Sequence, residues 1–205
     1  MPRAISTDQL LKKKFKILEL SPEFSESFGV PEDNGSWIIW GESGNGKTSF
    51  SMQLAKELTK FGTVVYNTLE EGARKSMQDA IIRSNMKECK ARFKLLDREN
   101  IADLRSRLEA QKSPKFVFID SLQYSGLNKK QFFDLVNDFP KKLFILISHA
   151  DGRLPEGRVA RSVRYHCDIK IRVEGFKAFA LSRSGGGKEY IIYQKGAAEY
   201  WGDVK

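Results

Sequence analysis

The stretch Ser36–Thr48 reads SWIIWGESGNGKT, and its last eight residues fit the pattern G-x-x-x-x-G-K-[ST]. The run Ser36–Trp40 is mostly apolar and β-prone, and residues 49–61 repeat apolar side chains at helical spacing. A strand, a glycine loop and a helix in this order are the context in which the pattern forms a phosphate-binding loop. A glycine-rich turn that binds nothing is the alternative, and it leaves the flanking elements unexplained.

A loop of this kind binds phosphate mainly through its backbone. The glycines allow N–H groups to point inward around an anion, and the N-terminus of the following helix adds partial positive charge. Lys47 can reach the β- and γ-phosphates, and the hydroxyl of Thr48 can ligate Mg²⁺. We therefore expect ATP to bind at nine consecutive residues: Gly41, Glu42, Ser43, Gly44, Asn45, Gly46, Lys47, Thr48 and Ser49.

Length and composition favour one globular α/β domain. The chain has 205 residues, 40% of them hydrophobic and 30% charged, and no apolar run long enough to cross a membrane. Neither cysteine belongs to a metal-binding or redox motif, so we expect reduced thiols in a cytoplasmic protein. The net charge of +9 favours an anionic partner such as nucleic acid, although many proteins are mildly basic.

Strands and helices alternate after an N-terminal arm, residues 1–35, which is expected to pack on the core or a neighbouring subunit, or else to form a solvated lead-in. Nearly unbroken apolar strands separated by helices indicate a parallel sheet covered on both faces. Residues 36–205 are therefore predicted to form a three-layer α/β domain. Its strands are expected at residues 63–68, 93–96, 115–120 and 143–148, and in C-terminal antiparallel hairpins at 169–173, 178–181 and 189–194.

Acidic residues follow two of these strands. Asp120 ends an apolar strand, which fits the second nucleotide-binding signature, and we expect this strand beside the phosphate loop with its carboxylate holding Mg²⁺ together with Thr48. A serine follows Asp120, so the Asp-Glu pair of many ring ATPases is absent and another carboxylate must activate water. Glu70 comes first after the neighbouring strand and is chosen over Glu71. Both glutamates could instead only place charge at the start of the next helix.

The order of these signatures resembles the RecA-like ATPase core, and within it the RadA/Sms and DnaB-helicase branch. Residues 68–71, TLEE, are similar to the segment that carries the catalytic glutamate in those proteins, and Glu70 takes that position. Residues 147–149, ISH, resemble the strand-end polar pair that senses the γ-phosphate, which implies this role for His149.

A third likeness lies near the C-terminus. Residues 181–186, LSRSGG, resemble the Lys-x-Arg-x-Gly element that reaches into the ATP of a neighbouring subunit. Arg183 falls on the arginine of that element, whereas Ser182 stands where a lysine is common. The likeness spans residues 35–193 but includes no counterpart of the RadA lid, zinc module or protease-like domain, or of the helicase N-terminal domain.

The resemblance implies a Mg²⁺-dependent ATPase that couples ATP binding and hydrolysis to DNA in recombination, repair or replication. It implies a catalytic group of Lys47, Glu70, His149 and Arg183, and a homo-oligomer, hexameric or filamentous, in which Arg183 completes a neighbour's site. DNA, single-stranded and bound without sequence specificity, is the expected partner. The short core would suit a protein of a phage or a mobile element.

Two loops are candidates for nucleic-acid contact, because they leave the carboxyl edge of the expected sheet. Residues 152–183 contain eight Lys or Arg against three acidic residues, an excess of five. Three arginines in this stretch recur every third residue along one helical stripe, which could neutralise phosphates, face solvent or contact a neighbour's nucleotide. The predicted contacts in the two loops are Lys129, Lys130, Arg153, Arg158, Arg161 and Arg164.

Two other functions remain open at this stage. A nucleotide-gated loader or regulator would assemble on ATP and hydrolyse little, but the glutamate after the second strand argues mildly against it. A small-molecule kinase is disfavoured by the hairpin ending and by the lack of an arginine-rich lid after the Asp120 strand. The sequence therefore defines the residues of the ATP site more precisely than it defines any substrate besides ATP.

Overall fold

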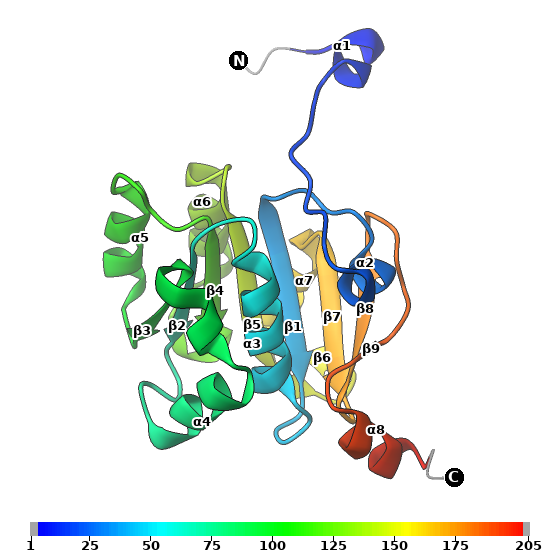
Figure 1. Cartoon of the computed structure of the whole chain (residues 1–205). Coiled ribbons are helices and arrows are strands. Elements are labelled where there is room, and N and C mark those ends of the chain that lie inside the picture. Colours follow the sequence, from blue (N-terminus) through cyan, green and yellow to red (C-terminus); the bar gives the residue numbers. More distant parts are fainter. Residues whose placement is uncertain (1–3, 203–205) are drawn as a thin grey trace.

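The chain forms one mainly parallel sheet with helices on both faces (Figure 1). The computed structural model describes residues 4–202. Six parallel strands are followed in space by two antiparallel ones, and a ninth short strand, β6 (Leu154–Pro155), pairs with β5. The spatial order is β3 (Phe93–Asp97), β2 (Val64–Thr68), β4 (Phe116–Asp120), β5 (Leu143–Asp151), β1 (Gly35–Gly41), β7 (Ile169–Glu174), β8 (Lys177–Ser182) and β9 (Tyr190–Ile191).

The helices divide between the two faces of the sheet, and each set encloses its own apolar core. One core includes Phe28, Phe50 and Met77 from α2 (Pro22–Phe28), α3 (Lys47–Leu58) and α4 (Lys75–Arg83). The other includes side chains of α5 (Ile101–Glu109), α6 (Lys129–Asp138) and α7 (Gly157–His166). The remaining elements are α1 (Thr7–Leu11), α8 (Gln194–Trp201) and the 3-10 helices η1 (Met86–Arg92) and η2 (Leu122–Tyr124). The predicted three-layer α/β architecture with C-terminal hairpins is thus confirmed.

The central strands are buried because both of their faces meet a helix layer. Alternate residues of β1 enter different cores: Trp37 and Ile39 pack with α2 and α3, whereas Ile38 and Trp40 pack with α7. A strand that faces apolar layers on both sides needs apolar residues at successive positions, which explains the unbroken runs in the sequence. No helix within residues 4–202 combines the length and apolar character needed to cross a membrane.

The N-terminal arm has two unlike parts. Leu18, Leu20, Phe24 and Phe28 are buried in the core, so this part belongs to the body of the domain. The preceding part projects beyond the amino edge of the sheet, where α1 buries none of its residues (Figure 1). The domain boundary proposed at residue 36 stays a prediction, because residues on both sides of it pack into the same core.

Two expectations about the sheet are wrong. The Asp120 strand β4 is not the direct neighbour of β1, because β5 lies between them and pairs in parallel with both. The last strand is only two residues long, and Gln194 begins helix α8 instead of ending a strand. Gly196 allows α8 to pack closely here, because a Cβ on it would meet the ring of Phe176 at 2.7 Å.

Candidate functional site

Six of the nine predicted nucleotide-binding residues line one cavity at the carboxyl edge of the sheet, and Gly41, Glu42 and Asn45 are not among its lining residues. The cavity has a volume of about 580 Å³. The phosphate loop, β2, β4 and β5 each contribute to it, because parallel strands end at the same edge. Its lining consists of Ser43, Gly44, Gly46, Lys47, Thr48, Ser49, Glu70, Glu71, Arg74, Asp120, Ile147, His149 and Phe176.

The glycines of the loop have the conformations that a phosphate cradle requires. Gly44 and Gly46 have φ of +79° and +96°, in the left-handed region that side chains disfavour. Gly46 is the N-cap of α3, so the first N–H groups of this helix face the cavity end of the loop. The Lys47 ammonium donates to the carbonyl oxygens of Gly41 at 2.6 Å and Glu42 at 2.9 Å. Burial lowers the pKa of Lys47, although neighbouring carboxylates oppose this effect.

Asp120 lies at the end of β4, with its carboxyl group deep in the cavity. The hydroxyl of the fully buried Tyr66 donates to its Oδ2 at 2.6 Å. Burial raises the pKa of Asp120 to about 6, against the lowering effects of the Tyr66 hydrogen bond and the Lys47 charge. Oxygen donors from Asp120 and Thr48 line the same cavity and are the type that Mg²⁺ prefers, so the site fits this ion together with phosphate oxygens.

Glu70 and His149 are brought together from different strands. His149 Nε2 lies 2.8 Å from Glu70 Oε2, and the Ser121 hydroxyl donates to the same oxygen at 3.2 Å. Both side chains remain partly open to the cavity, with exposed fractions of 38% for Glu70 and 37% for His149. Glu71 also lines the cavity. Together with Lys47, this arrangement presents a carboxylate, an ammonium group and an imidazole to the same cavity.

Several residues near the cavity carried no motif in the sequence. The turn between β7 and β8 braces the phosphate loop, since the Gly175 N–H donates to Asn45 Oδ1 at 2.7 Å and the Phe176 N–H donates to the Asn45 carbonyl at 3.2 Å. Arg74 and Phe176 also line the cavity. The β7–β8 hairpin lies about 130 residues beyond the phosphate loop in the sequence. Its position beside the loop follows only from the strand order β1–β7–β8, which no local sequence signal reports.

Arg183 lies far from this cavity. It follows β8, whose last residue Ser182 pairs with Ile169 near the start of β1, whereas the phosphate loop follows the end of β1 (Figure 1). Six residue steps along β1 separate the two edges by about 20 Å. Arg183 instead donates to Asp168 Oδ1 at 3.3 Å. Its guanidinium therefore cannot serve the cavity of its own chain.

The basic residues predicted for nucleic-acid contact have different surroundings. Arg158 is exposed in the first turn of α7, whereas Arg161 pairs with Asp151 and Arg164 stacks on Trp40 at 5.3 Å. These three arginines point in successively different directions around α7, and the last one faces the sheet. The reason is that a step of three residues falls short of a full helical turn by about 60°. Arg153 is exposed at the turn between β5 and β6.

The two predicted lysines occupy the first turn of α6. Lys129 lies over the Phe133 ring at 5.7 Å, and Lys130 pairs with Asp134 at 3.2 Å. Both interactions are local to the helix and leave the ammonium groups near its surface.

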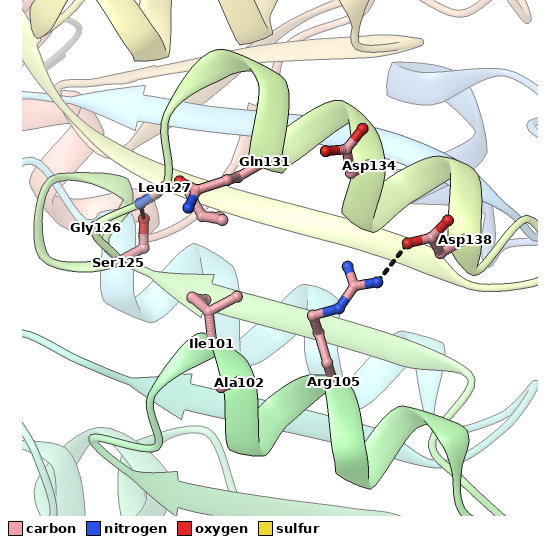
Figure 2. A pocket seen from close by; sticks show the side chains of 9 residues that line it. All are labelled: Ile101, Ala102, Arg105, Ser125, Gly126, Leu127, Gln131, Asp134 and Asp138. Atoms are coloured by element: carbon pink, nitrogen blue, oxygen red, sulfur yellow. Dashed lines mark hydrogen bonds and ion pairs between the residues drawn. The ribbon is translucent and has the colours of Figure 1, made fainter.

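A second hollow, of about 490 Å³, lies between α5 and α6 and is unrelated to the phosphate loop (Figure 2). Ile101 and Leu127 form apolar parts of its wall, and Arg105 pairs with Asp138 across one end. None of the predicted nucleotide residues lines it. This hollow therefore takes no part in the candidate nucleotide site.

Comparison with solved structures places this geometry in a known fold. The chain is similar to the flagellar accessory protein FlaH from Methanocaldococcus jannaschii, with a TM-score of 0.59 and 18% identity over 85% of this chain and 92% of that chain. The fold is RecA-like. No protein-family model and no curated protein matches the sequence. At this identity the likeness establishes the fold, and the chemistry has to be argued from the side chains.

Proposed function

We propose that this chain is a Mg²⁺-dependent ATPase of the RecA-like class. The observation that carries the proposal is the convergence of Lys47, Thr48, Asp120, Glu70 and His149 on one cavity of about 580 Å³. These five side chains come from three different strand ends and the first turn of α3. They supply a phosphate-binding cation, two metal-binding oxygen groups, a base and an imidazole donor.

Lys47 and the loop backbone would hold the phosphates of ATP. The Lys47 ammonium now donates to loop carbonyls, and phosphate oxygens would replace those acceptors with charged ones. Thr48 and Asp120 would hold Mg²⁺, which when bound neutralises charge that develops on the phosphates. The depressed pKa of Lys47 would return toward its usual range beside the phosphates, because an adjacent negative charge favours the ammonium form.

Glu70 is the residue best placed to orient or deprotonate the attacking water. Its carboxylate is held at Oε2 by Ser121 and His149, on the side of the cavity that faces the end of β5. Glu71 lines the cavity without these two contacts. His149 would sense the γ-phosphate, since its ring already lies within hydrogen-bond distance of the base.

Arg183 would complete the ATP site of a second copy. The separation of about 20 Å between the two edges of the sheet excludes a role in its own cavity. An exposed guanidinium at the opposite edge suits contact with a neighbour's phosphates, as arginine fingers supplied in trans do. The proposal therefore includes a homo-oligomer, a hexameric ring or a filament.

DNA is the proposed partner, and ATP hydrolysis would be coupled to DNA binding in recombination, repair or replication in the cytoplasm. Arg153 and Arg158 are exposed on the loop and helix that follow β5, whose residue His149 contacts Glu70. Single-stranded DNA would bind there through its phosphates, without readout of the nucleobases. It would then contact the segment that follows β5, the strand whose His149 touches the catalytic residue Glu70. The buried free thiols Cys89 and Cys167 suit a reducing compartment.

The deciding experiment measures ATP turnover by the wild type, Glu70→Gln and the matched control Glu71→Gln, with and without single-stranded DNA. We expect turnover stimulated by DNA, reduced at least 100-fold in Glu70→Gln and less than threefold in Glu71→Gln. Undetectable wild-type turnover with ATP-dependent assembly would instead support a nucleotide-gated loader. Equal loss in both variants would contradict the assignment of the base to Glu70.

A further inference from the structure

We propose that two buried hydroxyl groups, those of Tyr66 and Ser121, are positioning residues that fix the two carboxylates of the active site. Tyr66 holds Asp120, and Ser121 holds Glu70. This inference rests on the proposed ATPase function and adds two residues to its machinery. Neither residue lines the cavity, so each reaches it through the carboxylate that it contacts.

Tyr66 is held rigidly beneath Asp120. It has no exposed surface, and its ring stacks on Phe118 with centroids 5.3 Å apart. Tyr66 pairs with Phe118 across β2 and β4, so its hydroxyl reaches the diagonal position on the same face, which is Asp120. Burial raises the pKa of Tyr66 well above its usual value, which keeps the phenol protonated as a donor.

The contact divides the two oxygens of Asp120 between different tasks. Tyr66 occupies Oδ2 at 2.6 Å. The remaining oxygen is then available to the metal or to its bound water, in an orientation set by the sheet. Hydrogen bonds of this kind to a ligating carboxylate typically change metal affinity 10- to 100-fold when they are removed.

Ser121 ties Glu70 to the strand that carries Asp120. Its side chain is buried, with 1% of its surface exposed, and its hydroxyl donates to Glu70 Oε2 at 3.2 Å. The backbone follows the same path, because the Leu69 and Glu70 N–H groups both approach the Asp120 carbonyl, at 2.6 Å and 3.2 Å. The ends of β2 and β4 are thus joined by main-chain and side-chain contacts at the position of the base.

This arrangement separates two steps of catalysis. Loss of the Tyr66 hydroxyl would loosen the metal ligand and leave the base in place. Loss of the Ser121 hydroxyl would loosen the base and leave the metal ligand in place. A role limited to satisfying buried polar groups would instead lower stability and change neither kinetic parameter selectively.

The test compares Tyr66→Phe with Ser121→Ala in steady-state ATP turnover at varied Mg²⁺ concentration. Tyr66→Phe should raise the Mg²⁺ concentration for half-maximal activity about tenfold and change kcat at saturating Mg²⁺ less than threefold. Ser121→Ala should lower kcat about tenfold and leave the Mg²⁺ requirement within twofold. Tyr165→Phe and Ser106→Ala, which remove exposed hydroxyls, serve as matched controls.

A second comparison tests whether Ser121 acts through Glu70. In a Glu70→Gln background, the further change Ser121→Ala should have less than a twofold effect, because residues that act as a unit are not additive. An additional tenfold loss would overturn the role. Mn²⁺ binding to ATP-saturated Glu70→Gln, with and without Tyr66→Phe, gives the metal readout without turnover, and equal Mn²⁺ affinities would overturn the role of Tyr66.

The outcomes separate this inference from the function on which it rests. Wild-type turnover that neither variant changes would overturn the positioning roles alone. Parallel loss of kcat and Mg²⁺ affinity in both variants, together with lower unfolding temperatures, would show a general structural role and overturn them as well. A wild type that binds ATP and never hydrolyses it would overturn the ATPase and the role of Ser121 together.

Discussion

The two edges of the sheet carry complementary halves of the proposed active site. At the carboxyl edge, Lys47, Asp120, Glu70 and His149 surround a cavity of about 580 Å³. At the amino edge, Arg183 and Asp168 line a separate hollow of about 370 Å³. A sheet holds its edges at a fixed separation, so one copy cannot bring the two halves together. If Arg183 serves a neighbour's site, as proposed, catalysis depends on how copies are arranged as well as on the contents of each cavity.

The largest effect should come from removing the phosphate-binding cation at the carboxyl edge. Lys47→Ala should reduce ATP turnover at least 1000-fold and weaken ATP binding, because no other ammonium lines the described cavity and both ground-state and transition-state phosphates lose a charge-assisted contact. Turnover and nucleotide-binding assays measure this. Lys56→Ala is the control, since Lys56 lies on the same helix and pairs with Glu88 away from the cavity. Similar losses in both variants would indicate damage to α3 instead of a missing cation.

The amino edge should matter next, and only through a second copy. Arg183→Ala should bind ATP normally and turn over at least 100-fold more slowly, as expected for an arginine that acts in trans. Lys188→Ala, which removes a cation of the same connection paired with Glu26, should have little effect. Normal turnover by Arg183→Ala would remove the amino edge from the active site.

Mixing two inactive variants tests the trans arrangement directly. In random co-assemblies of equal amounts of Arg183→Ala and Glu70→Gln, one interface in four pairs an intact Glu70 with a neighbour's intact Arg183. About a quarter of wild-type turnover should therefore return, because such an interface joins unlike surfaces of two copies. The measurement is turnover as a function of mixing ratio, and a mixture that stays inactive would contradict the sharing of sites.

Much of the carboxyl edge could be predicted from the sequence because parallel strands end together. Asp120, Glu70 and His149 each follow a recognisable strand, and the topology then places them around the loop. The contact from Tyr66 could not be predicted in this way. It depends on the register between β2 and β4, and a slip of one residue would turn the phenol to the opposite face.

The C-terminal region shows where local pattern was overruled by packing. Residues 189–194 contain a run of four β-prone residues, yet only Tyr190 and Ile191 pair, and α8 forms around Gly196 despite the low helix propensity of glycine. Close contacts with the Phe176 and Tyr193 rings favour glycine at that position. These contacts join segments that lie far apart in the sequence, and no local signal reports them.

A pH effect of intermediate size should distinguish the buried carboxyl of Asp120 from exposed acids. Because burial raises its pKa from 3.8 to about 6, the folded state binds more protons than the unfolded state between these values. The contribution of Asp120 to stability therefore falls as pH rises, by about 2 kcal/mol between pH 4 and pH 6. Urea unfolding of nucleotide-free wild type and Asp120→Asn over this range measures the difference. Parallel pH curves for the two proteins would show that this carboxyl titrates normally.

The smallest effect should divide the basic residues near the carboxyl edge into two classes. Arg158→Ala should weaken single-stranded DNA binding three- to fivefold and reduce the salt slope by about one, because its exposed charge would contact phosphate. Arg164→Ala should instead lower the free energy of unfolding by about 1 kcal/mol, because its guanidinium stacks on Trp40. Fluorescence anisotropy with labelled DNA at several salt concentrations, together with urea unfolding, measures both effects. If Arg158→Ala changes neither affinity nor slope, the proposed DNA contact would move to the α6 lysines. These lysines follow β4, which ends at the proposed metal ligand Asp120, whereas Arg158 follows β5, which carries His149.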